Sequence, residues 1–184
     1  MNTAAVPDQT SVIQTWQDAW LAAFRHTLEG MKGTAFSGET FSQKDTAAAD
    51  LQAEGSSGQW LRFAIEDQPR AELAFWLSDP DRLALGQMVC GEPFSGDALF
   101  APEHEEALSS LVKTAADTAQ ANWAENSAQA ARLKWLGNER PAWAPAAQAG
   151  IRLKSADGLA VVFHLIINSE AGAASSPSPH TEFN

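Results

Sequence analysis

The sequence contains no tyrosine, a single cysteine and no long apolar run. Because Cys90 has no second cysteine to pair with, an internal disulfide framework is excluded and a reducing compartment is favoured. No stretch of roughly 18 apolar residues, the length that spans a membrane, occurs anywhere. The N-terminal residues MNTAAVPDQTSV also lack the basic start and apolar core of a secretory signal. We therefore expect a cytoplasmic protein without a membrane span.

Basic side chains are also scarce, with 12 Lys and Arg against 23 Asp and Glu and a formal charge of −11. This charge repels phosphate, which argues against a nucleic-acid partner. Apolar residues, in contrast, make up 45% of the 184 positions and include seven Trp and nine Phe. Without tyrosine hydroxyls these aromatic side chains serve packing, and they suffice for the core of one domain of ordinary size.

The first half of the sequence predicts a helix followed by strands. Apolar residues at steps of four and three indicate a helix over residues 12–31. This stripe consists of Trp16, Trp20, Phe24, Leu28 and Met31. Residues 34–42 alternate weakly, as in a short edge strand, and the polar residues 43–58 indicate a mobile connection. Two apolar runs, 59–65 and 71–77, flank a polar turn and predict a hairpin.

Two helices are predicted next. Ser78 and Pro80 are typical of a helix start, and Gly91 ends this short helix before a loop at residues 92–99. Pro102 opens a longer helix. Its apolar stripe consists of Leu108, Leu111, Val112, Ala115, Ala119 and Trp123. Because both long helices carry one apolar stripe, we expect them to pack against a common surface.

Strands return after the long helix. Residues 128–136 fit a strand, and residues 149–154 and 159–167 form a hairpin across an Asp-Gly turn. The run LAVVFHLII is almost continuously apolar, as in a central strand. Both halves of the chain run from helix to strands, which hints at a pseudo-repeat. The expected fold class is α+β, an antiparallel sheet packed by long helices.

This domain is expected to cover residues 12–168. Residues 1–11 are small and polar and indicate a flexible N-terminus. Residues 169–184 are rich in Ser, Pro and Ala and have too little apolar content to pack, so we expect a disordered tail or a linker.

Few side chains suggest catalytic or metal chemistry. The four histidines are His26, His104, His164 and His180. They are scattered, and with one cysteine no zinc pattern exists, so no metal or cofactor is predicted. His164 fits a half-buried histidine of a strand, whereas His104 lies among acidic residues and is expected to be solvated. Cys90 fits packing better than nucleophilic catalysis.

Two features are candidates for a partner interface. Glu103, Glu105 and Glu106 could bind a basic partner or a metal, although the match of their charge to the helix dipole explains them as well. Trp143 lies in a proline-rich segment. If exposed it would contact a partner, and if buried it would be a lid over the core, the reading we favour. The candidate interface residues are Glu103, Glu105, Glu106 and Trp143.

The order of these elements resembles that of the CheC-like family. The resemblance rests on the helix LSDPDRLALGQMVCGEP after a hairpin and on the acidic helix APEHEEALSSLVKTAADTAQANW, and it covers residues 12–168. The family includes the CheC and CheX chemotaxis phosphatases, the FliM middle domain and the N-terminal domain of FliN/FliY-type flagellar switch proteins. The resemblance implies a CheC-like α+β fold and partners among flagellar switch and chemotaxis proteins, including response regulators.

Active phosphatases of this family carry a Glu-x-x-Asn motif on the long helix. This spacing projects both side chains from one helix face toward the phosphoryl group of a response regulator. The motif is absent from this sequence, and the corresponding positions fall among Ser110, Lys113, Thr114 and Ala116. We therefore expect a non-catalytic protein–protein interaction domain of a flagellar motor switch or chemotaxis assembly.

Two alternatives stay open. One is a CheC-like phosphatase of a phosphorylated response regulator with atypical site residues. The other is a small-ligand-binding α+β domain, suggested only by the seven Trp residues. Self-association is also compatible with the sequence. FliN-type proteins carry a further β-rich domain that is not present here, so we expect either an excised domain with its linker or a stand-alone relative.

Overall fold

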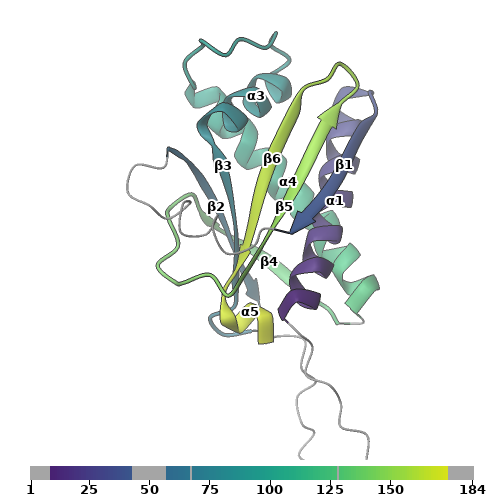
Figure 1. Ribbon diagram of the computed structural model, residues 1–184, viewed down its shortest axis with the longest axis vertical. Coiled ribbons are helices and arrows are strands. Elements are labelled where there is room, and N and C mark those ends of the chain that lie inside the picture. Colours follow the sequence, from purple (N-terminus) through teal and green to yellow (C-terminus); the bar gives the residue numbers. More distant parts are fainter. Residues whose placement is uncertain (1–8, 43–56, 67, 128, 174–184) are drawn as a thin grey trace, which may run out of the picture.

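The structure is a computed structural model that describes residues 9–42, 57–66, 68–127 and 129–173. Its centre is a six-stranded sheet in which every pairing is antiparallel. The two long helices lie side by side and cover one face of this sheet (Figure 1). The expected α+β class, with helices packed on an antiparallel sheet, is confirmed.

The strand order of the sheet is β1-β5-β6-β3-β2-β4. The strands are β1 (Phe36–Ser42), β2 (Gly58–Glu66), β3 (Glu72–Ser78), β4 (Arg132–Gly137), β5 (Ala147–Ser155) and β6 (Ala160–Ile167). The helices are α1 (Gln9–Lys32), α3 (Asp79–Cys90), α4 (Pro102–Ser127) and α5 (Ser169–Ala173). β6 is a central strand, as predicted. If β1, β2 and β3 are exchanged with β4, β5 and β6, the same order results when the sheet is read from its opposite edge. A pseudo-repeat requires this symmetry.

Helices α1 and α4 bury their apolar stripes together. Both stripes belong to one core with the inner face of the sheet. Trp16 of α1 stacks on Trp123 of α4 with ring centroids 4.1 Å apart. Trp20 meets Phe75 of β3 edge-on at 4.7 Å. The predicted common surface is confirmed, but the assignment of Met31 to the stripe is wrong, because this side chain is 50% exposed at the end of α1.

The short helix α3 begins and ends where the sequence predicts. The Ser78 hydroxyl accepts a hydrogen bond from the backbone N–H of Asp81 at 3.3 Å, and Pro80 lies in the first turn. Gly91 follows the last residue with φ 74°, in the left-handed region that favours glycine at a helix end. These caps fix the direction in which the following loop leaves the helix.

The C-terminal boundary differs from the prediction. Residues 169–173 form the short helix α5, although the sequence predicts a disordered tail from residue 169. The cause is Asn168, whose Oδ1 accepts hydrogen bonds from the N–H groups of Glu72 and Ala171. Its Nδ2 donates to the carbonyl of Arg70 at 2.6 Å. One buried side chain therefore caps α5 and ties it to β3.

Other predicted segments differ less or lie outside the described residues. β4 begins at Arg132 rather than at residue 128, because the preceding segment is rich in Ala, which has low strand propensity. Most of the predicted flexible N-terminus (residues 1–11) and mobile connection (residues 43–58) lies outside the described ranges. Within those ranges, every helix is too short or too polar to span a membrane.

Candidate functional site

The loop between α3 and α4, residues 91–99, is the most exposed apolar feature of the described chain. It lies at the end of the molecule where the turn between β5 and β6 also lies (Figure 1). Every residue of this α3–α4 loop is exposed. Among them are two large apolar side chains, Phe94 at 61% and Leu99 at 89% exposure. Apolar side chains held in water in this way are typical of a contact surface.

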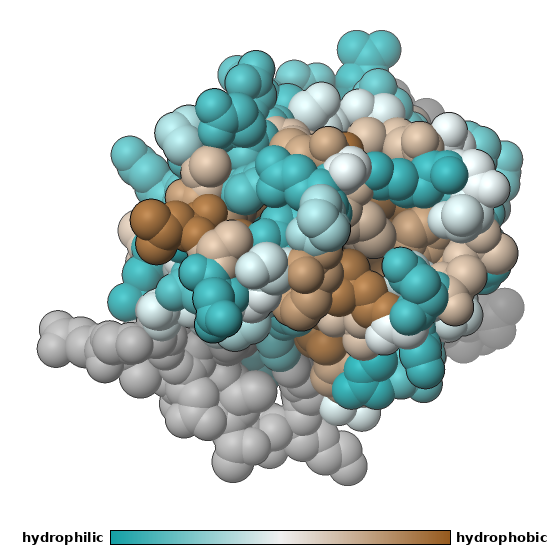
Figure 2. Space-filling model, turned by 90° about the horizontal axis from the view of Figure 1, so that it is seen from above, coloured by the Kyte–Doolittle hydropathy of each residue, from teal (hydrophilic) through white to brown (hydrophobic). Residues whose placement is uncertain are grey.

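A groove adjoins the α3–α4 loop. It lies between Phe94, the end of α1 and the β5–β6 turn. Its apolar lining includes Phe36, Ala84, Met88 and Leu159. Its charged lining residues are Lys32, Glu92 and Asp157. Figure 2 looks onto this end and shows apolar patches between hydrophilic side chains. The groove encloses about 310 Å³, at the lower limit for small-molecule pockets, so it suits one or two side chains of a partner.

Gln87 holds the middle of the loop in place. This side chain is buried, and its Nε2 donates to the carbonyl of Ser95 at 3.1 Å. Its Oε1 accepts from the backbone N–H of the same residue, also at 3.1 Å. Both ends of one amide therefore bind one loop residue, next to the exposed Phe94.

His104 holds the start of the loop in place. Its Nδ1 accepts a hydrogen bond from the backbone N–H of Ala101 at 3.0 Å, and its Nε2 lies 2.8 Å from Glu92 Oε2. The prediction that His104 is solvated is wrong, since the residue is only 4% exposed. The reason is the close approach of α3, where a Cβ added to Gly86 would lie 2.8 Å from the His104 Cβ.

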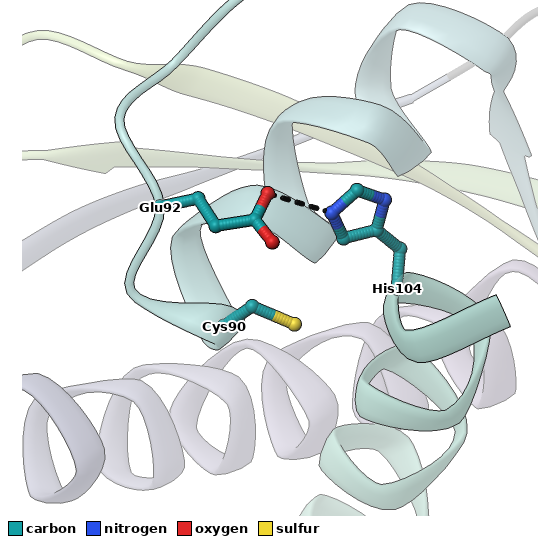
Figure 3. Close-up of side chains that lie close together, drawn as sticks. All are labelled: Cys90, Glu92 and His104. Atoms are coloured by element: carbon teal, nitrogen blue, oxygen red, sulfur yellow. Dashed lines mark hydrogen bonds and ion pairs between the residues drawn. The ribbon is translucent and has the colours of Figure 1, made fainter. Parts of the chain in front are cut away.

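The structure also brings together three potential metal ligands that the sequence separates. The ligand atoms of Cys90, Glu92 and His104 all lie within 4.8 Å of one another (Figure 3). This cluster could not be predicted from the sequence, because Cys90 lies on α3 and His104 on α4. Since Nδ1 of His104 is an acceptor, the ring hydrogen sits on Nε2 and is donated to Glu92. A metal at Nε2 would have to displace that hydrogen and break the bond to Ala101.

The Cys90 thiol does not favour nucleophilic attack. Cys90 is exposed, so the packing role predicted for it is wrong. Loss of hydration and the neighbouring carboxylates of Glu92 and Glu103 raise the pKa of this thiol above its ordinary value. Nucleophilic attack needs the thiolate, which a raised pKa disfavours. In this cluster, the hydrogen bond between His104 and Glu92 holds the loop.

The four candidate interface residues do not form one surface. Glu103, Glu105 and Glu106 are exposed, and the first two lie in the first turn of α4, as dipole matching predicts. Glu105 accepts a hydrogen bond from Asn138 Nδ2 at 2.6 Å. Trp143 instead packs against a small apolar cluster on the sheet face opposite the helices. That cluster consists of Trp60, Ala74, Trp76 and Ile166.

Trp143 is held in its place by a polar contact as well. Its Nε1 donates to Glu72 Oε2 at 2.7 Å, and the same oxygen accepts from Arg62 at 2.8 Å. The residue is half-buried. Its position is that of a lid on the outer sheet face, away from the α3–α4 loop.

Helix α4 carries no Glu-x-x-Asn sequence like that of the phosphatases. Ser110, Lys113 and Thr114 are exposed on this helix, and Ala116 is buried. The amide of Asn122 donates to the carbonyl of Ala19 on α1 at 3.1 Å, so it serves helix packing.

Comparison with solved structures shows that the chain has the CheC-like fold, which flagellar switch and chemotaxis proteins share. No protein-family model and no curated protein sequence matches the chain. A chain of the FliG–FliM complex from H. pylori is similar with a TM-score of 0.65 and 9% identity, over 90% of this chain and 97% of that chain. FliY of Thermotoga maritima has a TM-score of 0.64 and 11% identity, over 94% and 96%. A CheC-like superfamily protein from Shewanella has a TM-score of 0.51 and 12% identity, over 84% and 98%.

Proposed function

We propose that the chain is a non-catalytic protein–protein interaction domain of a flagellar motor switch or chemotaxis assembly. The observation that carries this proposal is the α3–α4 loop, which exposes Phe94 and Leu99 while buried side chains hold its backbone. The chain has the fold of FliM and FliY, and one similar structure is a FliG–FliM complex.

The held loop favours binding for a thermodynamic reason. Ordering a mobile loop on association costs free energy, and a loop that is already held in the free protein avoids much of this cost. Gln87 and His104 supply that order, since each binds the loop through a side chain with little exposure. An aromatic side chain such as Phe94 then acts as an anchor, the kind of residue that carries much of the binding energy at interfaces.

The charges around the groove indicate the chemistry of the partner. Glu92 and Asp157 line it, Glu103 lies close by, and Lys32 is the basic residue among the lining side chains. A partner segment with an apolar side chain flanked by Lys or Arg is complementary to this surface. Charge complementarity of this kind raises the association rate and weakens with added salt.

Binding measurements with purified switch and chemotaxis proteins of the same organism test the proposal. We expect Phe94→Ser to weaken binding by about tenfold or more, as loss of an anchor does. Leu136→Ser is the matched control, because Leu136 is also an exposed apolar residue, at 38%, but lies on strand β4. Equal effects of the two substitutions would show that the loop is not the contact surface.

A second assay addresses the phosphatase alternative. The chain is incubated with a phosphorylated response regulator of the same organism, and phosphate loss is followed over time. We expect the rate of phosphate loss to be the same with and without the chain. Any acceleration would overturn the non-catalytic assignment. If it survives Phe94→Ser, the active surface lies elsewhere than on the α3–α4 loop, and the outer surfaces of α1 and α4 are examined next.

A further inference from the structure

The end of helix α3 fixes the backbone around Cys90 and Glu92. Cys90 is the last residue of the helix, and Gly91 turns the chain with φ 74°. The N–H of Glu92 then donates to the carbonyl of Gln87 at 2.9 Å, as in a closed helix-end turn. The two side chains therefore leave a backbone that is held by hydrogen bonds, although both are exposed.

His104 approaches the same turn from helix α4. Its Nε2 lies 2.8 Å from Glu92 Oε2, so this nitrogen faces the end of α3 (Figure 3). The Cys90 thiol faces α4 in turn, since its Sγ donates to the backbone carbonyl of Glu103 at 3.8 Å. The close approach of the His104 Cβ to Gly86 holds the buried ring against α3. Three ligand atoms thus converge from two packed helices.

We propose that Cys90 Sγ, a carboxylate oxygen of Glu92 and His104 Nε2 form a binding site for Zn²⁺. Thiolate, imidazole and carboxylate are the ligands that zinc takes in proteins, whereas Mg²⁺ and Ca²⁺ prefer oxygen alone. The three atoms lie within 4.8 Å of one another. Tetrahedral zinc needs them about 3.3–3.6 Å apart, a small movement for two exposed side chains. Water or a group of a partner would take the fourth position.

The surrounding charge favours a cation at this place. Cys90 lies at the C-terminal end of α3, where the helix dipole is negative. Loss of hydration and the carboxylates of Glu92 and Glu103 raise the pKa of the Cys90 thiol and outweigh the opposite effect of Lys32. A bound Zn²⁺ reverses this balance, because it stabilises the thiolate directly. The thiol proton is released to the solvent when the metal binds.

Zinc binding has a local cost at the start of α4. A metal on Nε2 moves the ring hydrogen to Nδ1, so His104 can no longer accept from the N–H of Ala101. The bond from Nε2 to Glu92 is also replaced. Each such bond corresponds to about tenfold in affinity, whereas zinc sites with four ligands reach about 50 nM or below. With three ligands we expect a dissociation constant of about micromolar order.

Calorimetric titration of the untagged full chain with Zn²⁺ tests the site, with the thiol kept reduced. We expect one Zn²⁺ per chain and the release of about one proton. Cys90→Ser and Glu92→Gln should each raise the dissociation constant by about tenfold or more. His26→Gln is the matched control, because His26 is exposed on α1, and should bind like the wild type. Absence of one-to-one binding, or unchanged binding by either cluster variant, overturns the proposal.

Two further measurements test the ligand set. Co²⁺ in place of Zn²⁺ should give the near-ultraviolet charge-transfer absorption of a metal thiolate, and Cys90→Ser should abolish it. Hydrogen exchange at the Ala101 amide should become faster when Zn²⁺ is bound, because this N–H loses its acceptor on His104. Mg²⁺ at the same concentration should leave the exchange unchanged. Unchanged protection of Ala101 in the Zn²⁺ complex would contradict ligation by His104.

Discussion

The imidazole Nδ1 of His104 accepts a hydrogen bond from the backbone N–H of Ala101, three residues earlier, at 3.0 Å. Ala101 immediately precedes helix α4, so His104 occupies the third helical position. A Glu or Gln usually takes this role in a capping box. Here a histidine takes it, and its second nitrogen remains available to bind Glu92. One side chain therefore both starts the helix and fixes the loop before it.

Replacement of His104 should separate these two functions. We expect His104→Ala to lower the free energy of unfolding by about 1–3 kcal/mol, because a cap is lost and a buried donor or acceptor is left unpaired. His104→Gln can still accept from Ala101 and should recover part of this loss. Urea unfolding gives the stabilities, and hydrogen exchange of residues 91–99 reports the loop. Full wild-type protection of the loop in His104→Ala would contradict the proposed tether.

The packing of the two long helices gives a second prediction. Leu111 is buried in the core shared by α1 and α4, so Leu111→Ala should cost about 2–5 kcal/mol. Glu106→Gln on the exposed side of α4 should cost only a few tenths of a kcal/mol, as the loss of a dipole partner does. Thermal or urea unfolding measures both. The reverse ranking would mean that the polar side of α4 is the buried one.

Asn168 is the third target. Its side chain is buried and binds two backbone N–H groups and one carbonyl. Asn168→Ala leaves these groups unpaired and should cost about 1–3 kcal/mol. Cleavage within residues 169–173 by a non-specific protease should also become faster, since α5 loses its cap. Unchanged cleavage would show that α5 is held by Ala171 packing alone.

The fourth prediction concerns acid stability. Burial lowers the pKa of His164 below its ordinary value of 6.5, so the folded state disfavours the charged ring. The unfolded chain takes up this proton first as the pH falls. The contribution of His164 is therefore present above about pH 6.5 and is lost as the pH falls below it. Unfolding free energies between about pH 8 and pH 5 should show a smaller loss for His164→Phe than for the wild type.

Much of the fold could be predicted because its signals are local. The stripe from Trp16 to Leu28 and the stripe from Leu108 to Trp123 each lie within one helix, and their spacing alone identifies the buried side. The caps of α3 are likewise set by residues next to its ends. The strand order could not be predicted, since β1 pairs with β5 more than a hundred residues later.

The loop contacts were missed for a related reason. His104 and Glu92 are twelve positions apart, and only the packing of α3 on α4 brings them together. Acidic neighbours in the sequence suggested exposure, yet the close approach at Gly86 buries the ring. A local signal did exist, because His104 lies three residues after Ala101 at the start of a helix opened by proline. At α5, the residue just before the helix, Asn168, shows how one polar side chain overrides a composition typical of a disordered tail.

The strand order has a consequence for how the molecule can assemble. The edge strand of each half pairs only with the other half: β1 bonds to β5, and β4 bonds to β2. Two half-size chains that exchange their outer strands would have the same strand order. Neither half can complete its own sheet, so a chain cut between β3 and α4 should yield two fragments that fold only when they are mixed.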